Sequence, residues 1–555
     1  MRILIVLLLS FLGLIVPSDE TTVIEDYYYN GVVSSADKLA SEVGIKILQE
    51  GGNAIDAAVG VGFALAVVYP QAGNIGGGGF MVIRLADGTA TSIDFREKAP
   101  LLASRNMYLD ANGNVIEELS TTGHLAAGVP GSVAGLLYAL EKYGTMSRNQ
   151  VMKYAIELAE NGFIVNEHLA NAIRSYNDDF KKFESSYKVF KNVKANQPFY
   201  QKDLANTLKA IRDYGRDGFY KGKVADLIVN EMKRGNGIIS YKDLEEYNVI
   251  EREVLKGTYR GYDIITMRPP SSGGICLIEL LNILEYYDLS TMTQTEYVHL
   301  LSEAMKRVYA DRAEFMGDED FVNVPVDILT SKVYAKRRME GFNEKKASTS
   351  DEIKHGDAYY KESTNTTHYS VADKFGNVVA TTTTLNDNFG CKVIVDGAGF
   401  LLNNEMDDFA IKPNFPNIYG LIGSEANSIA PGKRMLSSMT PTIVLKDNKP
   451  FLILGSPGGG KIITSVLQTI IHILDFKRTL SDAIEIRRFH HQWLPDYIQY
   501  EQGCFPKAVI SQLMNMGHNL KEVSNFGRID AIMIFSDGKM TGHSDSRGYG
   551  MALGY

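Results

Sequence analysis

The stretch Asn-Thr-Thr-His-Tyr-Ser-Val-Ala at residues 365–372 decides the expected fold and chemistry of this chain. Alternation along a strand would place Thr366, His368 and Ser370 on one face. The polar segment 343–365, which has few aliphatic residues, precedes it and is expected to be an exposed, mobile loop. After a cut before Thr366, the α-amine of that residue, with a pKa of about 8, could act as base for its own hydroxyl. His368 is the other candidate for the general base. The alternative to any catalytic role is that this stretch is an ordinary β-strand rich in Thr and Tyr.

Hairpin and helix signals surround this stretch. Strand-like runs flank short turns at residues 87–88, 375–377 and 447–448, and such turns join antiparallel strands. The segments 151–160 and 462–474 repeat apolar residues at helical spacing. Hairpins interspersed with helices predict an α+β fold in which helical layers cover antiparallel sheets.

The N-terminus has the features of a secretory signal peptide. Arg2 precedes an apolar run over residues 3–16, and Val16-Pro17-Ser18 offers small residues for cleavage. This run is shorter than the roughly 20 residues that a membrane-spanning helix needs. We therefore expect residues 1–18 to be removed, no stable membrane span, and a periplasmic or secreted protein. An uncleaved membrane anchor is the alternative.

Composition and charge exclude several classes of protein. The 555 residues are 45% hydrophobic and 22% charged, with a formal net charge of −9, which is ordinary for a globular protein. No basic stripe suits nucleic acid, so no nucleic-acid partner is expected. The cysteines Cys276, Cys391 and Cys504 are too scattered for a disulfide framework or a CxxC pair. His490 and His491 are adjacent and cannot share a helical face, so we expect no metal site.

A glycine-rich loop at Gly455–Lys461 follows an apolar run and precedes a helix, as a phosphate-binding loop does. Ile462 stands where that motif needs Ser or Thr, and Pro457 removes a backbone N–H group. Nucleotide binding through this loop is therefore only an alternative. Backbone N–H groups at a helix N-terminus could instead stabilise the oxyanion of an acyl-transfer reaction.

Taken together and in order, the motifs of the chain resemble the gamma-glutamyltranspeptidase family. They extend over essentially the whole mature chain, at Gly51–Ala58, Gly73–Phe80, Asp94–Pro100, Pro269–Gly274, Asn365–Ala372, Leu385–Asn386, Leu401–Phe409, Leu436–Met439 and Gly455–Gly459. The resemblance implies an N-terminal-nucleophile (Ntn) hydrolase with a four-layer αββα fold, whose precursor cuts itself into two chains that stay together as a heterodimer. It places the cut between Asn365 and Thr366, which leaves a large chain of residues 19–365 and a small chain of residues 366–555.

The resemblance also implies the catalytic roles. Thr366 would be the nucleophile for both self-cleavage and turnover, with its own α-amine as base in preference to His368. Thr384 would hydrogen-bond the nucleophile. The backbone N–H groups of Gly458 and Gly459 would meet the oxyanion, and neither a metal nor an organic cofactor is implied.

The substrate-binding residues that the resemblance implies are Arg96, Asn386, Glu405, Asp408, Tyr419, Ser437 and Ser438. The forked guanidinium of Arg96 suits the α-carboxylate of a γ-glutamyl group, and Ser437 and Ser438 would add hydrogen bonds. Asn386, Glu405 and Asp408 would accept hydrogen bonds from the α-ammonium. Tyr419 matches a lid tyrosine that screens the site from water.

The implied activity is a ping-pong reaction on small molecules. Thr366 would attack the γ-glutamyl amide of glutathione or a related compound, and the γ-glutamyl-enzyme would pass its acyl group to water, an amino acid or a peptide. The alternatives are an Ntn-type cephalosporin or glutaryl acylase and a polyglutamate-processing relative. A non-catalytic secreted binding protein is a further alternative from another class.

Overall fold

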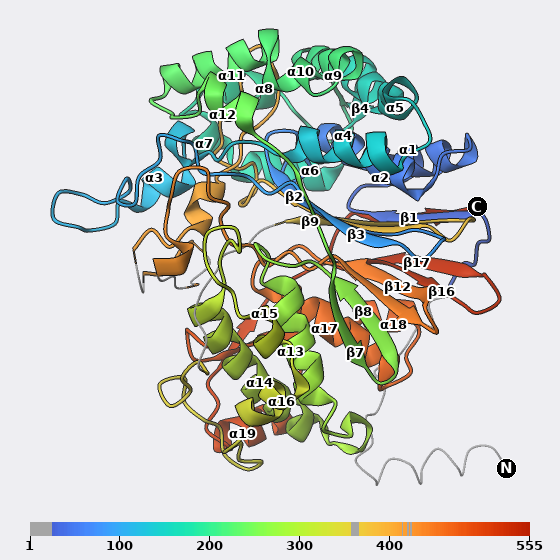
Figure 1. The fold of residues 1–555 in the computed structure, drawn as a ribbon, viewed down its shortest axis with the longest axis vertical. Coiled ribbons are helices and arrows are strands. Elements are labelled where there is room, and N and C mark those ends of the chain that lie inside the picture. The colour runs from blue at the N-terminus through green and yellow to red at the C-terminus, as the bar shows by residue number, and fades with distance from the viewer. Residues whose placement is uncertain (1–24, 357–365, 413–414, 419–420, 422–424) are drawn as a thin grey trace.

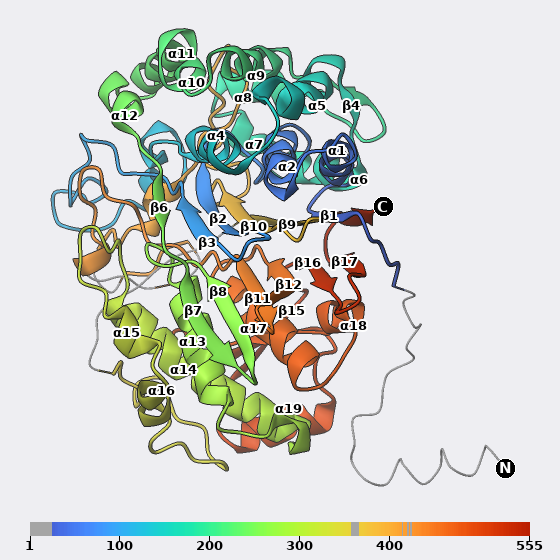
Figure 2. The same cartoon turned by 45° about the vertical axis from the view of Figure 1, so that its right-hand side comes forward.

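Two antiparallel β-sheets lie face to face, and helices cover both outer faces (Figures 1 and 2). The computed structural model describes residues 25–356, 366–412, 415–418, 421 and 425–555. The expected signal peptide, Asn365 and Tyr419 lie outside these residues. Within the described part of the chain, no helix has both the length and the apolar character to cross a membrane.

The first sheet has seven strands in the order β18 (Met551–Gly554), β1 (Gly31–Ser35), β9 (Thr367–Asp373), β10 (Val378–Thr384), β2 (Gly78–Arg84), β3 (Ala90–Asp94) and β6 (Ile250–Arg252). The second has six, in the order β17 (Met540–Ser544), β16 (Asp530–Ile534), β12 (Lys449–Gly455), β11 (Thr442–Lys446), β8 (Tyr262–Thr266) and β7 (Leu255–Tyr259).

The three predicted hairpins are confirmed as β2–β3, β9–β10 and β11–β12. Local turn chemistry explains why the sequence revealed them. Asp447 and Asn448, between β11 and β12, both have a positive φ, of 50° and 58°, and Asn and Asp tolerate this better than other non-glycine residues.

The outer face of the first sheet is covered by α1 (Lys38–Gln49) and α2 (Ala54–Val68), against which α4 (Ser132–Tyr143) and α5 (Arg148–Asn161) pack. The second sheet is covered by α13 (Gly273–Leu284), α17 (Lys461–Leu474) and α18 (Leu480–Glu485), and α14 (Gln294–Phe315) packs on α13. All residues of α2 are buried, and a capping box of Asn53 and Asp56 begins it. Helices α5 and α17 confirm the helices predicted at 151–160 and 462–474.

The remaining helices are α3 (Glu117–Thr121), α6 (Glu167–Ser175), α7 (Asn177–Phe180), α8 (Glu184–Phe190), α9 (Lys202–Tyr214), α10 (Asp217–Tyr220), α11 (Gly222–Arg234), α12 (Tyr241–Glu246), α15 (Val326–Leu329), α16 (Lys332–Arg338) and α19 (Lys507–Asn515). Short strands are β4 (Phe163–Ile164), β5 (Pro198–Phe199), β13 (Phe489–His490), β14 (Ile498–Glu501) and β15 (Leu520–Val523).

Apolar side chains from both sheets fill the space between them. They include Val82, Ala380, Ile443, Ile453 and Ile532, all at most 3% exposed. Two larger apolar clusters lie between each sheet and its helices. The order helix, sheet, sheet, helix confirms the predicted α+β, four-layer αββα architecture.

The polar segment before β9 differs in part from the expectation of a loop. Most residues of 343–356 are exposed, as predicted, but the segment is also held to the second helical layer. The N–H of Ala347 donates to the Met516 carbonyl at 2.7 Å, and the N–H of Gly356 donates to Asp311 at 2.6 Å. Residues 357–365 lie outside the described part of the chain.

Candidate active site

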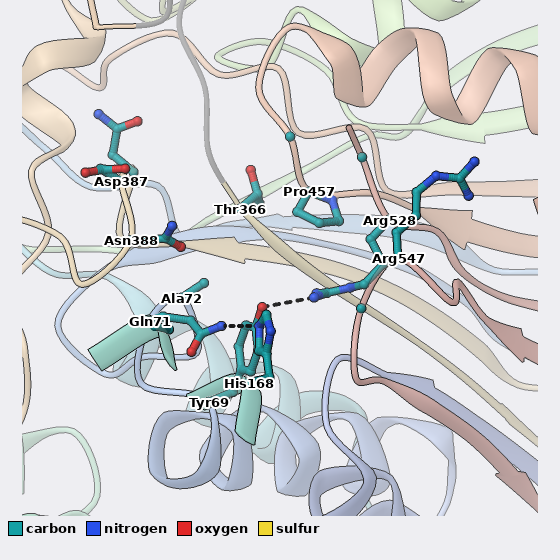
Figure 3. Close-up of a pocket in the computed structure, with 15 residues that line it drawn as sticks. Tyr69, Gln71, Ala72, His168, Thr366, Asp387, Asn388, Pro457, Arg528 and Arg547 are labelled. Atoms are coloured by element: carbon teal, nitrogen blue, oxygen red, sulfur yellow. Dashed lines mark hydrogen bonds between the residues drawn. The ribbon is translucent and has the colours of Figure 1, made fainter. Parts of the chain in front are cut away.

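Thr366 directly precedes β9, a central strand of the first sheet. Strand β9 pairs with β10 from Thr367 onward and with β1 from Tyr369 onward, so pairing with β10 holds its start. Thr366 is 7% exposed and lines a cavity of about 260 Å³ (Figure 3). The nucleophile predicted from the sequence therefore lies at a cavity and not on an open surface.

His368 is fully buried and faces the second sheet. Its Nδ1 lies 2.9 Å from Oγ1 of Thr382, and its Nε2 lies 3.0 Å from Oγ of Ser370. Burial lowers the pKa of His368 to about 3. Because both ring nitrogens are engaged and the pKa is so low, His368 is poorly suited to act as a general base.

The predicted partners at the end of β10 lie close together. The hydroxyl of Thr384 accepts a hydrogen bond from the N–H of Asn386 at 2.7 Å. Asn386 has a positive φ of 71°, lines the cavity and donates through Nδ2 to the Asn404 carbonyl. Its Oδ1 is buried and has no hydrogen-bond partner among the described residues, so it is available to a donor group of a ligand.

The glycine-rich loop joins β12 to α17. Gly458 and Gly459 have φ values of 124° and 74°, which only glycine adopts readily. Among the described residues, neither N–H group has a hydrogen-bond partner. Gly458 also lines the cavity, so this loop can present unpaired backbone donors close to Thr366.

Arg96 follows β3 and is buried among carboxyl groups. Its Nη1 lies 2.8 Å from Oε2 of Glu405, and its Nη2 contacts Oδ2 of Asp408. Both acids lie on the 3-10 turn Glu405–Asp408. The sequence analysis assigned Arg96 to the α-carboxylate and these acids to the α-ammonium of the donor, whereas the structure pairs Arg96 and the acids directly with one another.

Ser437 and Ser438 lie next to this cluster. The carbonyl of Leu436, the preceding residue, accepts from Arg96 Nη2 at 3.0 Å. The hydroxyl of Ser438 accepts from Nη2 of Arg312 on α14 at 2.9 Å. Arg312 is 1% exposed and was not predicted, because no motif of the sequence marks it.

The predicted residues thus form two adjoining groups. Thr366, Asn386 and Gly458 line the cavity. The others lie behind it, at Arg96, Thr384, Glu405, Asp408, Ser437 and Ser438, each at most 3% exposed.

Sequence reasoning missed several residues that line the cavity, among them Tyr69, His168 and Arg528. Tyr69 ends α2, His168 lies on α6, and Arg528 precedes β16. None belongs to a recognisable motif, and only the fold brings them to Thr366.

One cluster away from this site has donor atoms that could hold a metal ion. A nitrogen of His299, a nitrogen of His518 and a carboxylate oxygen of Glu303 lie within 4.8 Å of one another. The Glu303 carboxylate already pairs with Lys306 and Arg307. A cation would have to compete with these two side chains.

Three comparisons place the chain among known proteins. The sequence profile described as Gamma-glutamyltranspeptidase matches residues 40–555. The chain is 47% identical over 524 residues to a glutathione hydrolase proenzyme of Escherichia coli, covering 93% of this chain and 90% of the relative.

Two solved structures are also similar. A cephalosporin acylase from Bacillus halodurans superposes with a TM-score of 0.87 at 25% identity, covering 97% of this chain and 98% of the acylase. A chain of the Helicobacter pylori gamma-glutamyltranspeptidase has a TM-score of 0.57 at 49% identity. The aligned region makes up 61% of this chain and 97% of the Helicobacter pylori chain.

Proposed function

The chain belongs to the gamma-glutamyltranspeptidase family and is a self-processing glutathione hydrolase and gamma-glutamyltransferase, and we propose that Thr366 performs both reactions. The observation that carries this assignment is that Thr366 directly precedes a central strand and lines a cavity with Gly458, whose N–H is unpaired among the described residues. A nucleophile beside oriented backbone donors is what acyl transfer requires.

Self-cleavage begins with attack of the Thr366 hydroxyl on the Asn365 carbonyl. The new C–O bond forms as the peptide C–N bond breaks, and the released α-amine takes the proton. Water then hydrolyses the ester, which leaves Asn365 as the end of a large chain of residues 19–365. Thr366 becomes the first residue of a small chain of residues 366–555.

Turnover uses the same hydroxyl. The free Thr366 amine removes the hydroxyl proton, and the oxygen attacks the γ-carbonyl of the donor. The N–H groups of Gly458 and Gly459 stabilise the oxyanion, the C–N bond breaks, and the leaving amine takes the proton. Water or an acceptor amine then attacks the γ-glutamyl ester. No metal or organic cofactor enters this scheme.

The donor's amino-acid head fits the group behind the cavity. Arg96, with the hydroxyls of Ser437 and Ser438, would bind the α-carboxylate. Asp408 and the unpaired Oδ1 of Asn386 would accept from the α-ammonium. We assign Thr384 to orienting the nucleophile and Glu405 to holding Arg96, and Tyr419 remains a proposed lid.

The expected two-chain form has support from a relative. The solved Helicobacter pylori chain spans 61% of this chain, close to the share that residues 19–365 make up. We propose that the two chains remain a heterodimer, and that the protein acts after export, in a periplasm or outside the cell.

Mass analysis of the purified protein tests the proposal. One fragment should begin at Thr366, and the preparation should release p-nitroaniline from γ-glutamyl-p-nitroanilide. An intact, inactive chain would contradict it. The acylase alternative rests on the similarity to the cephalosporin acylase. It would be favoured if glutaryl amides, which lack the α-amino group, were hydrolysed faster than γ-glutamyl amides.

A further inference from the structure

Of the described residues proposed for the donor's amino-acid head, Asn386 alone lines the cavity at Thr366. Thr366, Asn386 and Gly458 line it, but Arg96 and its acidic partners do not. The reacting carbonyl has to lie beside Thr366 and Gly458. A donor whose head reaches Arg96 therefore leaves this cavity for the amine on the other side of the scissile bond.

Arg528 lines this cavity and contacts Thr367, the residue that follows the nucleophile. Its Nη2 donates to Oγ1 of Thr367 at 3.3 Å. Its Nη1 donates to the Tyr69 hydroxyl at 2.9 Å, as Figure 3 shows. The guanidinium also lies over the Tyr69 ring, 5.3 Å from its centroid. These contacts hold the charge at the start of β9.

Arg528 is less fully paired with carboxylates than Arg547, the other arginine that lines the cavity. Its buried Nε forms an ion pair with the Asp530 carboxylate, 3.6 Å away, and makes no hydrogen bond among the described residues. Arg547 also lines the cavity, but it donates to both carboxylate oxygens of Glu501 and to Asp545. Arg547 is therefore paired with two carboxylates at short range, whereas Arg528 has one carboxylate partner at 3.6 Å. Each Nη nitrogen of Arg528 carries two N–H groups and has one acceptor among the described residues, so a donor remains for an anionic ligand.

The aromatic wall next to Arg528 suits the body of a small peptide. His168 stacks on Tyr69, with ring centroids 6.4 Å apart, and on Tyr549 at 4.8 Å. Gln71 donates from Nε2 to His168 at 3.0 Å, and the Gln71 Oε1 has no partner among the described residues. The cavity of about 260 Å³ thus combines an aromatic wall, an unused acceptor and a cation.

We propose that Arg528 binds the carboxylate of the leaving amine or acceptor, so that this cavity selects amino acids and short peptides that carry a free C-terminal carboxylate. The inference rests on the proposed function, because it needs Thr366 as the acylated residue. In glutathione, the group recognised is the glycine carboxylate of the cysteinylglycine that leaves. A guanidinium suits a carboxylate through paired N–H donors.

The test compares substrates with and without that carboxylate in two enzymes. Glutathione and its glycinamide derivative are the matched donors, and Arg528→Gln is the variant. The wild type should process glutathione about 10- to 100-fold better in kcat/KM than the amide. Arg528→Gln should lose this preference, and its kcat/KM should fall at least about 10-fold more for glutathione than for γ-glutamyl-p-nitroanilide, whose leaving group has no carboxylate. Arg528→Lys, which keeps the charge, should restore part of the preference.

Each outcome decides the question. Equal kcat/KM of the wild type for glutathione and its amide overturns the inference, as does a preference that survives Arg528→Gln. If that variant does not self-cleave, the wild type with glycylglycine and glycylglycinamide as acceptors still decides. A KM at least about 10-fold lower for the carboxylate is expected, and equal values overturn the inference. Failure of the wild type to cleave itself or to use any γ-glutamyl donor would instead contradict the proposed function.

Discussion

Arg96 Nη1 lies 2.8 Å from Oε2 of Glu405, and at most 1% of either side chain is exposed. Glu97 and Asp408 also lie against this guanidinium. One guanidinium cannot balance three buried carboxylates, and burial raises the pKa of both Glu97 and Glu405. The cluster is therefore held close to neutrality by protonated acids, and it presents a pre-ordered arginine to the site.

The two acids on the 3-10 turn should differ in importance. Because burial raises the pKa of Glu405, Glu405→Gln replaces a largely protonated acid by its neutral isostere and should change kcat/KM less than about 3-fold. Asp408→Asn should lower kcat/KM by about 100-fold, since a charge-assisted contact is lost. Steady-state kinetics with γ-glutamyl-p-nitroanilide measure both. Equal losses in the two variants would contradict the distinction.

Glu97 should make the protein less stable as the pH rises. Burial raises its pKa from 4.5 to about 8, so the folded state keeps a proton that the unfolded state has released across this window. Stability then falls from about pH 4.5 to pH 8, by at most about 1.4 kcal/mol per pH unit. Thermal unfolding of Glu97→Gln should show a gain in Tm over the wild type that grows from pH 5 to pH 8. A gain that is the same at every pH would contradict the assigned pKa.

Thr366→Ala should abolish both cleavage and turnover, because the variant has no hydroxyl to attack either carbonyl. Thr366→Ser should cleave and keep part of its activity. Thr367→Ser is the matched control, since it keeps the hydroxyl that accepts from Arg528. Gel and mass analysis report cleavage, and a cleaved Thr366→Ala chain would show that the nucleophile is another residue.

His368→Gln distinguishes the two candidate bases. If the Thr366 amine is the base, this variant should be cleaved and should keep kcat within about 10-fold. A stability loss of about 1–3 kcal/mol is expected from the changed hydrogen bonds to Ser370 and Thr382. A general base contributes about 100- to 10,000-fold. A fully cleaved and folded variant with a loss of that size would identify His368 as the base.

The glycine loop can be tested with adjacent substitutions. An alanine at Gly458 would be strained at a φ of 124°, and its Cβ would lie 3.2 Å from the backbone of Gly527. Gly458→Ala should lower kcat by about 100- to 1,000-fold through a displaced oxyanion donor. Gly460→Ala is the matched control, because its nearest contact would be an ordinary 3.5 Å. Similar activity of the two variants would argue against an oxyanion role for this loop.

Local features of the sequence predicted the elements well. Short turns such as Asp87-Gly88 and Asp447-Asn448 determine hairpins through backbone preferences of a few residues, and β2–β3 and β11–β12 follow from them. Helix α17 follows from an apolar stripe. The described residues before β9 were less well predicted, because their anchoring depends on Asp311 and Met516, which are distant in the sequence.

The candidate site likewise has a part that local sequence predicts and a part that depends on the tertiary structure. By itself the sequence determined the family, the nucleophile candidate Thr366 and the residue types for a γ-glutamyl group, because these are carried by contiguous motifs. Only the tertiary structure decided that Arg96 is paired with Asp408, 312 positions away, and that Arg528 reaches Thr367 across 161 positions. The reason is physical: desolvation and hydrogen bonding act between atoms in contact, and which distant residues come into contact is settled by the packing of the two sheets and their helices.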